Sequence, residues 1–288
     1  MYFFITCALI FLCTPGADMV SVPRSDGQVI ARADTALGRL MLMHGEIRDI
    51  SPALAGMYPV AVVEGDSLYI FDVDSTGTAY RFQRKTPVPF PMTKGIRASF
   101  PLSSYDNRPT CVVSREVFDT KEGLATIFHE FVHCFQARTC ENDLKAGLHV
   151  ARAAMEAHDY SWEINRHFPY GDSAFVRAYT GFLLSLDEGN LVKVQRSVDA
   201  LQQVLSPDDY EYMVWVEWKE GFARTIENRI RLRYALQPNT AGREQPYDRV
   251  AFYYGGEKYI TYIAARDGNV IPEIRGLFTE MLKGPTGM

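Results

Sequence analysis

The sequence predicts an α+β protein in which a β-rich part comes first and a mainly helical part follows. Apolar and polar residues alternate in short runs between residues 60 and 82, and turn-forming residues separate these runs as in antiparallel hairpins. After Gln136 the apolar spacing changes to the period of about 3.6 residues that is typical of helices. We therefore expect a β-rich subdomain over residues 18–118 and a helical subdomain over residues 119–288.

Within the β-rich part, we expect a short helix at 31–43, because its apolar residues recur with the helical period. Short runs rich in β-branched and aromatic residues predict strands, at 60–63, 68–73, 78–82, 96–100 and 110–114. The segment 86–91 carries three prolines and cannot pair as a central strand, so we expect it to cross between layers. The strands 96–100 and 110–114 could either offer an exposed edge to an extended peptide or be paired fully inside the sheet.

In the helical part, amphipathic segments predict helices at 141–164, 173–186, 190–205, 207–234, 247–265 and 271–282. The strongest helix start is Ser206-Pro-Asp-Asp209. It combines a capping hydroxyl, a proline in the first turn and two acids at the positive end of the helix dipole.

Composition and charge exclude several classes of protein. A chain of 288 residues with 47% hydrophobic and 23% charged residues can bury a substantial core and is not disordered. Its formal net charge of -5, with Lys and Arg scattered along the sequence, offers no basic surface for phosphates. Nucleic acid is therefore not an expected partner.

The N-terminus resembles a secretory signal peptide. Residues 2–13 are an apolar run too short to span a bilayer, and the small residues at 14–17 suit signal-peptidase cleavage. We expect residues 1–17 to be removed and the protein to be exported to the periplasm or secreted, with no stable membrane span after cleavage. No Lys or Arg precedes the apolar run, so an uncleaved anchor or a buried first strand stays an alternative.

Five cysteines bear on the redox compartment. If Cys7 and Cys13 leave with the signal peptide, Cys111, Cys134 and Cys140 remain. A Cys111–Cys140 disulfide is the simpler pairing in an oxidising compartment, because Cys134 lies within a predicted helix. Three buried free thiols fit the sequence equally well.

The segment 120–136 carries His129-Glu130-x-x-His133 and is expected to be a helix, with Asp119 or Thr120 as its cap. On a helix the two histidines project from one face, close enough for both imidazoles to bind one zinc ion. Glu130 lies about 100° around the helix from His129 and can reach a water at the metal as a general base. The alternative is a pair of core histidines bonded to backbone carbonyls.

A zinc site needs at least one more protein ligand, and the segment Trp218-Lys-Glu220-Gly-Phe-Ala-Arg supplies a candidate. Together with His129-Glu-Phe-Val-His133 it resembles the gluzincin (thermolysin-like) metallopeptidase superfamily. The resemblance implies a zincin-like fold, Zn²⁺ as cofactor, a peptide or protein substrate, and Glu220 as third ligand. It also implies that Gly221 and Ala223 allow two helices to approach closely. The likeness covers these two short motifs and the order of the two parts.

The chain departs from the gluzincin pattern in two ways. Glu220 follows His133 by 87 residues, farther than in thermolysin-like enzymes, and Arg224 stands where those enzymes carry an acid that orients a ligand histidine. We expect Glu227 as a substitute for that acid. The competing third ligand is Glu156, which follows His133 by 23 residues, has small neighbours, and has Asp159 as a possible supporting acid.

Two further residues enter the site hypothesis. Tyr253, in Tyr-Tyr-Gly-Gly256, resembles the tyrosine that stabilises the oxyanion in gluzincin aminopeptidases, although aromatic residues at a helix start usually serve packing. Glu163, in Trp162-Glu-Ile-Asn165, is interpreted as structural rather than ligating.

The functional prediction is a zinc metallopeptidase in which Glu130 is the general base for attack by water on a peptide bond. The alternative is a catalytically silent zincin-fold protein that binds a component of the cell envelope. A third possibility is hydrolysis of a non-peptide amide, which the same metal chemistry permits.

Overall fold

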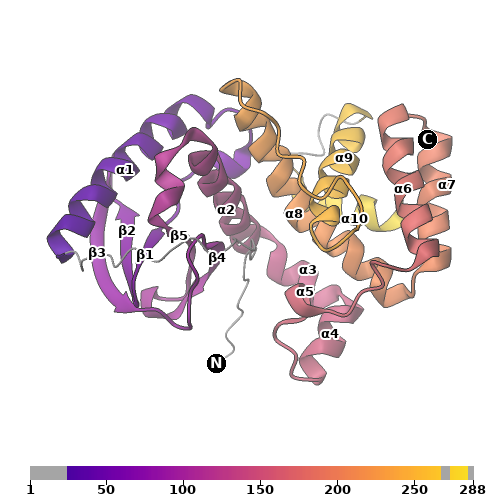
Figure 1. The fold of residues 1–288 in the computed structure, drawn as a ribbon, viewed down its shortest axis with the longest axis horizontal. Coiled ribbons are helices and arrows are strands. Elements are labelled where there is room, and N and C mark those ends of the chain that lie inside the picture. Colours follow the sequence, from indigo (N-terminus) through magenta and orange to yellow (C-terminus); the bar gives the residue numbers. More distant parts are fainter. Residues whose placement is uncertain (1–24, 267–272, 285–288) are drawn as a thin grey trace. The chain divides into compact units, whose positions relative to one another are not determined.

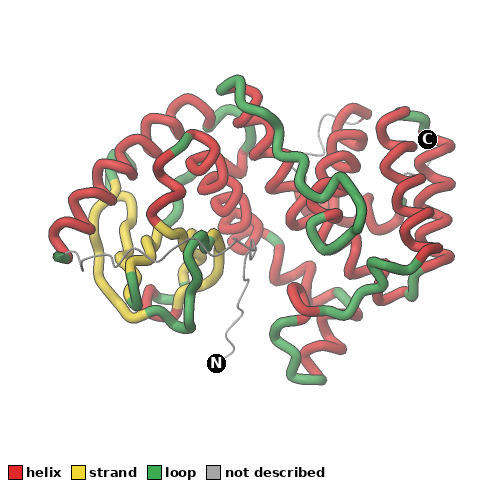
Figure 2. Tube along the Cα trace, in the orientation of Figure 1, coloured by secondary structure: helices red, strands yellow, loops and turns green. Residues whose placement is uncertain are grey.

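The computed structural model describes residues 25–266 and 273–284, so the predicted signal peptide, residues 1–17, lies outside the described residues. The chain divides into two compact units, Met1–Cys134 and Phe135–Met288. The division falls inside one helix, whereas the sequence suggested a boundary between residues 118 and 119. The first unit contains a five-stranded mixed sheet and the second is mostly helical (Figures 1 and 2), which confirms the α+β class.

The first helix, α1 (Asp26–Ile47), is longer at both ends than the predicted range 31–43. Ser25 and Gln28 form a reciprocal capping box, in which the Ser25 side chain accepts from the Gln28 N–H and the Gln28 side chain accepts from the Ser25 N–H. This local cap explains the earlier start. A buried stripe that includes Val29, Leu37 and Leu40 turns one side of α1 toward the core.

The strands lie at or near their predicted positions: β1 (Val60–Glu64), β2 (Ser67–Val73), β3 (Tyr80–Pro87), β4 (Arg97–Leu102) and β5 (Arg108–Ser114). Their order in the sheet is β3-β2-β1-β5-β4. The pairs β1–β2, β2–β3 and β4–β5 are antiparallel, but β1 and β5 pair in parallel, which the hairpin pattern did not indicate. Of the two strands discussed as possible docking edges, β4 lies at an edge and β5 is internal.

Both faces of the sheet are covered within the first unit. One face carries a cluster that includes Ile70 and Phe100, and Val88, Phe90 and Met92 pack against it. These last residues lie in and just after the proline-rich segment that was expected to cross between layers. On the other face, the Tyr69 hydroxyl donates to Asp26 at the start of α1, at 2.5 Å.

Residues 25–134 of the first unit include three 3-10 helices: η1 (Pro52–Leu54), η2 (Ser103–Tyr105) and η3 (Arg115–Asp119). Immediately after η3 comes α2 (Lys121–Thr139), the predicted HExxH helix, which crosses the division between the units.

The second unit is built around α8 (Pro207–Arg233), which is buried along most of its length. Its start agrees with the prediction, since the Ser206 side chain accepts from the Asp209 N–H at 3.1 Å. The other helices are α3 (Glu141–Gly147), α4 (His149–Glu156), α5 (Trp162–Asn165), α6 (Ser173–Glu188), α7 (Leu191–Val204), α9 (Ala251–Arg266) and α10 (Ile274–Lys283).

The single helix predicted at 141–164 is wrong, because the structure has three short helices, α3 to α5, in that range. Leu148 is extended, with φ -73° and ψ 134°, and His158 has a φ of 57°. Contacts with a residue far away in the sequence explain why this segment is not one straight helix. Glu141 and Glu163 both bond to Lys219, whereas a straight helix would place them about 33 Å apart along its axis.

Cys111, Cys134 and Cys140 are buried free thiols, so the suggested Cys111–Cys140 disulfide is not formed. Among the described residues, none of the helices has the length and apolar character needed to cross a membrane.

Candidate metal centre

The two histidines and the glutamate of the HExxH motif lie on α2, as predicted. Thr120 precedes the first residue of α2, and its hydroxyl accepts a hydrogen bond from the Gly123 N–H at 3.0 Å. His129, Glu130 and His133 are all buried, and the imidazole centroids of the two histidines are 4.9 Å apart. The sequence-based geometry, in which both imidazoles share one face of a helix, is therefore present.

Aromatic contacts hold this part of α2 in the first unit. The Phe128 ring lies 6.3 Å from the His44 ring of α1, and the Phe131 ring lies 5.6 Å from Tyr58. At the start of α2, a Cβ on Gly123 would lie 1.9 Å from the Val117 carbonyl oxygen. Only glycine fits there, so η3 and the first turn of α2 are in direct backbone contact.

Glu220 lies in the buried middle of α8 and is 6% exposed. Beside it, the side chain of Gln136 donates to the Lys219 carbonyl at 3.1 Å. The close helix approach at Gly221 is to α9, because a Cβ on Gly221 would lie 2.5 Å from backbone atoms of Gly256. The Gly221 position thus fixes α8 against α9, a partner that the sequence did not identify.

His129, His133 and Glu220 form a group that could hold a metal ion, since their candidate ligand atoms lie within 4.8 Å of one another and all three are buried. The donor set of two imidazoles and one carboxylate is typical of catalytic zinc sites that keep a position open for water or substrate. Glu130 is not a member of this group. It is the next residue after His129 on the same helix.

The competing ligand, Glu156, is not part of that group and is exposed at the end of α4. The acid proposed to support it, Asp159, instead accepts hydrogen bonds from the backbone and hydroxyl of Ser161, each at 2.9 Å. Glu156 therefore has the surroundings of a solvated helix-end carboxylate.

Glu227, expected to orient a ligand histidine, is engaged within the second unit. Its carboxylate contacts Arg224 at 3.5 Å and Arg231 at 2.8 Å, and it accepts from the side chain of Asn239 at 3.1 Å. These contacts join α8 to the segment that follows it.

Tyr253 lies in the first turn of α9 and is fully buried. Its hydroxyl accepts a hydrogen bond from Arg249, and its ring lies 5.2 Å from the Arg249 guanidinium and 5.7 Å from that of Arg224. Burial raises the pKa of Tyr253 well above its ordinary value; Arg249 opposes this effect, and the charge and hydrogen bonding of Glu220 add to it. The phenol stays protonated and can donate one hydrogen bond.

A buried ring of four charges lies next to Glu220 in the second unit, and no sequence motif indicated it. Lys219 contacts Glu141 and Glu163, each at 2.7 Å, and Lys145 contacts the same two carboxylates at 3.0 and 2.5 Å. Burial alone would raise the pKa of Glu163, but the two ammonium groups outweigh it and hold that pKa well below its usual range. The interpretation of Glu163 as a structural residue agrees with these contacts.

The only sequence signal for this ring was the spacing of Glu141 and Lys145, which are one helical turn apart. Nothing in the sequence indicated that Lys219 joins them. Arg249, which bonds to Glu220, was missed for the same reason: it belongs to no motif and lies in the turn before α9.

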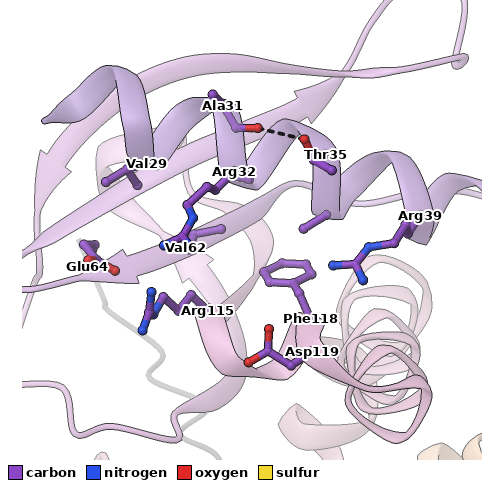
Figure 3. Close-up of a pocket in the computed structure, with 12 residues that line it drawn as sticks. Val29, Ala31, Arg32, Thr35, Arg39, Val62, Glu64, Arg115, Phe118 and Asp119 are labelled. Carbon is purple, nitrogen blue, oxygen red and sulfur yellow. Dashed lines mark hydrogen bonds between the residues drawn. The ribbon is translucent and has the colours of Figure 1, made fainter. Parts of the chain in front are cut away.

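A separate pocket of about 550 Å³ lies within the first unit, between α1, β1 and η3 (Figure 3). Apolar side chains, among them Val62 and Phe118, line it together with Arg32, Arg39 and Arg115. It does not include His129, Glu130 or His133. The arginines are exposed and border an apolar helix stripe, which is the usual place for long charged side chains.

No protein-family model, curated protein or solved structure matches the chain. The assignment of a function therefore depends on the chemistry of the residues themselves.

Proposed function

We propose that the protein is a zinc-dependent metallopeptidase of the gluzincin type. The observation that carries the proposal is the buried group of His129, His133 and Glu220, with Glu130 as the adjacent residue on α2. Two imidazoles and one carboxylate are the side-chain donors that zinc takes in catalytic sites, so a divalent cation is the ligand that this set of residues suits. The resemblance of the two motifs to gluzincins supports the same conclusion.

The residues fit zinc in type and in spacing. Ligand atoms around a tetrahedral zinc lie about 3.4 Å apart. The 4.8 Å that bounds the group is somewhat larger, so zinc binding would draw the ligand atoms closer together. When bound, zinc would lower the pKa of a coordinated water and polarise the scissile carbonyl.

Different residues of the chain would then bind the metal, transfer the proton and stabilise the oxyanion. His129, His133 and Glu220 hold the ion, and Glu130 accepts the proton of the attacking water and passes it to the leaving amine. Tyr253, kept protonated by burial, is the candidate donor to the developing oxyanion. Two departures from the gluzincin pattern remain part of the proposal: the long separation of Glu220 from the histidines, and Arg224 in place of an orienting acid.

The proposal is tested with Glu130→Gln, which keeps the size of the side chain and removes its basicity. Zinc content after dialysis and cleavage of a peptide library, with and without chelator, are measured for the wild type and the variant. We expect wild-type zinc content and a loss of at least a hundredfold in cleavage rate. Glu122→Gln is the matched control, since Glu122 is an exposed acid on the same helix.

An active Glu130→Gln protein contradicts the mechanism. A wild-type protein that binds zinc but cleaves no peptide favours the catalytically silent binding protein. For export, we propose cleavage of residues 1–17, which N-terminal sequencing of the mature protein would detect as a start at Asp18.

A further inference from the structure

Arg249 holds the carboxylate of Glu220 in place. Its Nη2 donates to Glu220 Oε1 at 3.1 Å, its Nη1 donates to the Tyr253 hydroxyl, and its Nε donates to the Glu163 backbone carbonyl at 2.8 Å. Each of its three nitrogens has a different acceptor, and the three acceptors come from α8, α9 and α5. The guanidinium is therefore fixed from three sides and cannot follow a movement of Glu220.

The positive charge of Arg249 also stabilises the buried carboxylate of Glu220. A carboxylate that is 6% exposed loses most of its hydration, and a bonded cation compensates for that loss. The residue one helical turn after Glu220 is Arg224, whose guanidinium bonds to the carbonyls of Asn239 and Ala241 at 3.0 and 3.4 Å. Arg224 is thus committed to the segment after α8, and Arg249 makes the cationic contact to Glu220.

We propose that Arg249 is a positioning residue for metal binding, which fixes the rotamer of Glu220 by bonding to one of its oxygens. This inference rests on the proposed zinc site. A carboxylate has two oxygens with about four acceptor positions, so a bond from an arginine and a bond to an ion are compatible. Because the Arg249 fork is rigid, the carboxylate is ordered before the ion arrives, and less conformational entropy is lost on binding.

The test is a double-mutant cycle on zinc affinity, measured by competition with a chromophoric chelator. Arg249→Gln is compared with the wild type, and again in a Glu220→Gln background. We expect Arg249→Gln to weaken zinc binding tenfold to a hundredfold in the wild type, and less than twofold in the Glu220→Gln background. Arg249→Lys keeps the charge without the fork, so it should recover part of the affinity.

Two controls separate positioning from a general structural effect. Arg275→Gln removes an exposed arginine of the same unit, whose partner is Asp143, and should leave zinc affinity unchanged. Thermal unfolding in chelator reports the stability of the metal-free protein. If Arg249→Gln does not fold, Arg249→Lys in both backgrounds carries the same comparison.

The outcomes distinguish this inference from the proposed function. Wild-type zinc affinity in Arg249→Gln, or an equal loss in both backgrounds, overturns the positioning role and leaves the peptidase proposal in place. A wild-type protein that binds zinc without cleaving peptides refutes the peptidase and leaves the positioning role in place. A wild-type protein that binds no zinc refutes both.

Discussion

Gln136, near the end of α2, donates a hydrogen bond from Nε2 to the backbone carbonyl of Lys219, the residue before Glu220. Both side chains are buried. On α2, Gln136 follows His133 by three residues, so the two side chains lie on neighbouring positions of the helix surface. One glutamine therefore ties the end of α2 that belongs to the second unit to the segment of α8 that carries Glu220.

Replacing this glutamine should loosen the site without removing a ligand. We expect Gln136→Ala to weaken zinc binding about tenfold and to lower the free energy of unfolding by about 1 kcal/mol. Chelator competition and urea denaturation measure the two effects. Gln203→Ala, at an exposed position of α7, should change neither quantity.

The choice between the two candidate third ligands is decided by metal analysis. Glu220→Ala should lose zinc on dialysis, because Glu220 belongs to the buried group with His129 and His133. Glu156→Ala should keep a full equivalent, because Glu156 is exposed. Loss of zinc in Glu156→Ala alone would show that the ligand assignment is wrong.

Breaking the buried ring of charges should strongly destabilise the second unit. Lys219→Met removes one of two cations and leaves the carboxylates of Glu141 and Glu163 undercompensated, so we expect a loss of about 3–5 kcal/mol in the free energy of unfolding. Lys193→Met removes a surface ion pair with Glu188 and should change the same quantity by less than about 1 kcal/mol. Urea denaturation followed by tryptophan fluorescence reports both values.

Glu217 predicts a dependence of stability on pH. Burial raises the pKa of Glu217 to about 8, although the hydrogen bond with Tyr179 opposes the shift. The Tyr179 hydroxyl lies 2.7 Å from Glu217 Oε1 and 3.1 Å from the Ala251 carbonyl. The Tyr179 hydroxyl is the donor at both contacts, and its one hydrogen is shared between the Glu217 carboxyl group and the Ala251 carbonyl.

Because the pKa is raised in the folded protein, the native state binds the proton more tightly than the unfolded chain does. The resulting stability is complete below the ordinary pKa of 4.5 and is lost as the pH rises through about 8. Glu217→Gln keeps the hydrogen bonding without a titrating proton and should flatten this decline. Unfolding free energies at pH 5, 7 and 9 test the prediction, and an unchanged slope in the variant would contradict it.

Local sequence patterns predicted much of the fold. The strand positions, α2 and the start of α8 follow from alternation, helical period and capping, which act over a few residues. The parallel pairing of β1 with β5 was not predictable in this way, since it joins residues about fifty positions apart. The break of 141–164 into three helices also depends on distant Lys219.

In the candidate site, too, local features could be predicted from the sequence and contacts between distant residues could not. The motif residues His129, Glu130 and His133 span five positions, a little more than one helical turn, so their spacing alone indicates their arrangement. Glu220 was proposed from a resemblance, because a separation of 87 positions from His133 carries no information about its distance in space from the histidines. Arg249 could not be found at all, since an arginine in a turn has no pattern until the helices around it are placed.

The contact of Gly221 with Gly256 restricts how this protein can change over evolution. A side chain at Gly256 would begin 2.1 Å from the Glu217 carbonyl oxygen, and one at Gly221 would meet backbone atoms of α9. Even alanine would push apart the helix that carries Glu220 and the helix that follows Arg249. Homologous chains should therefore keep both glycines while their surfaces diverge, and this distant pair should mark ancestry more reliably than the short histidine motif.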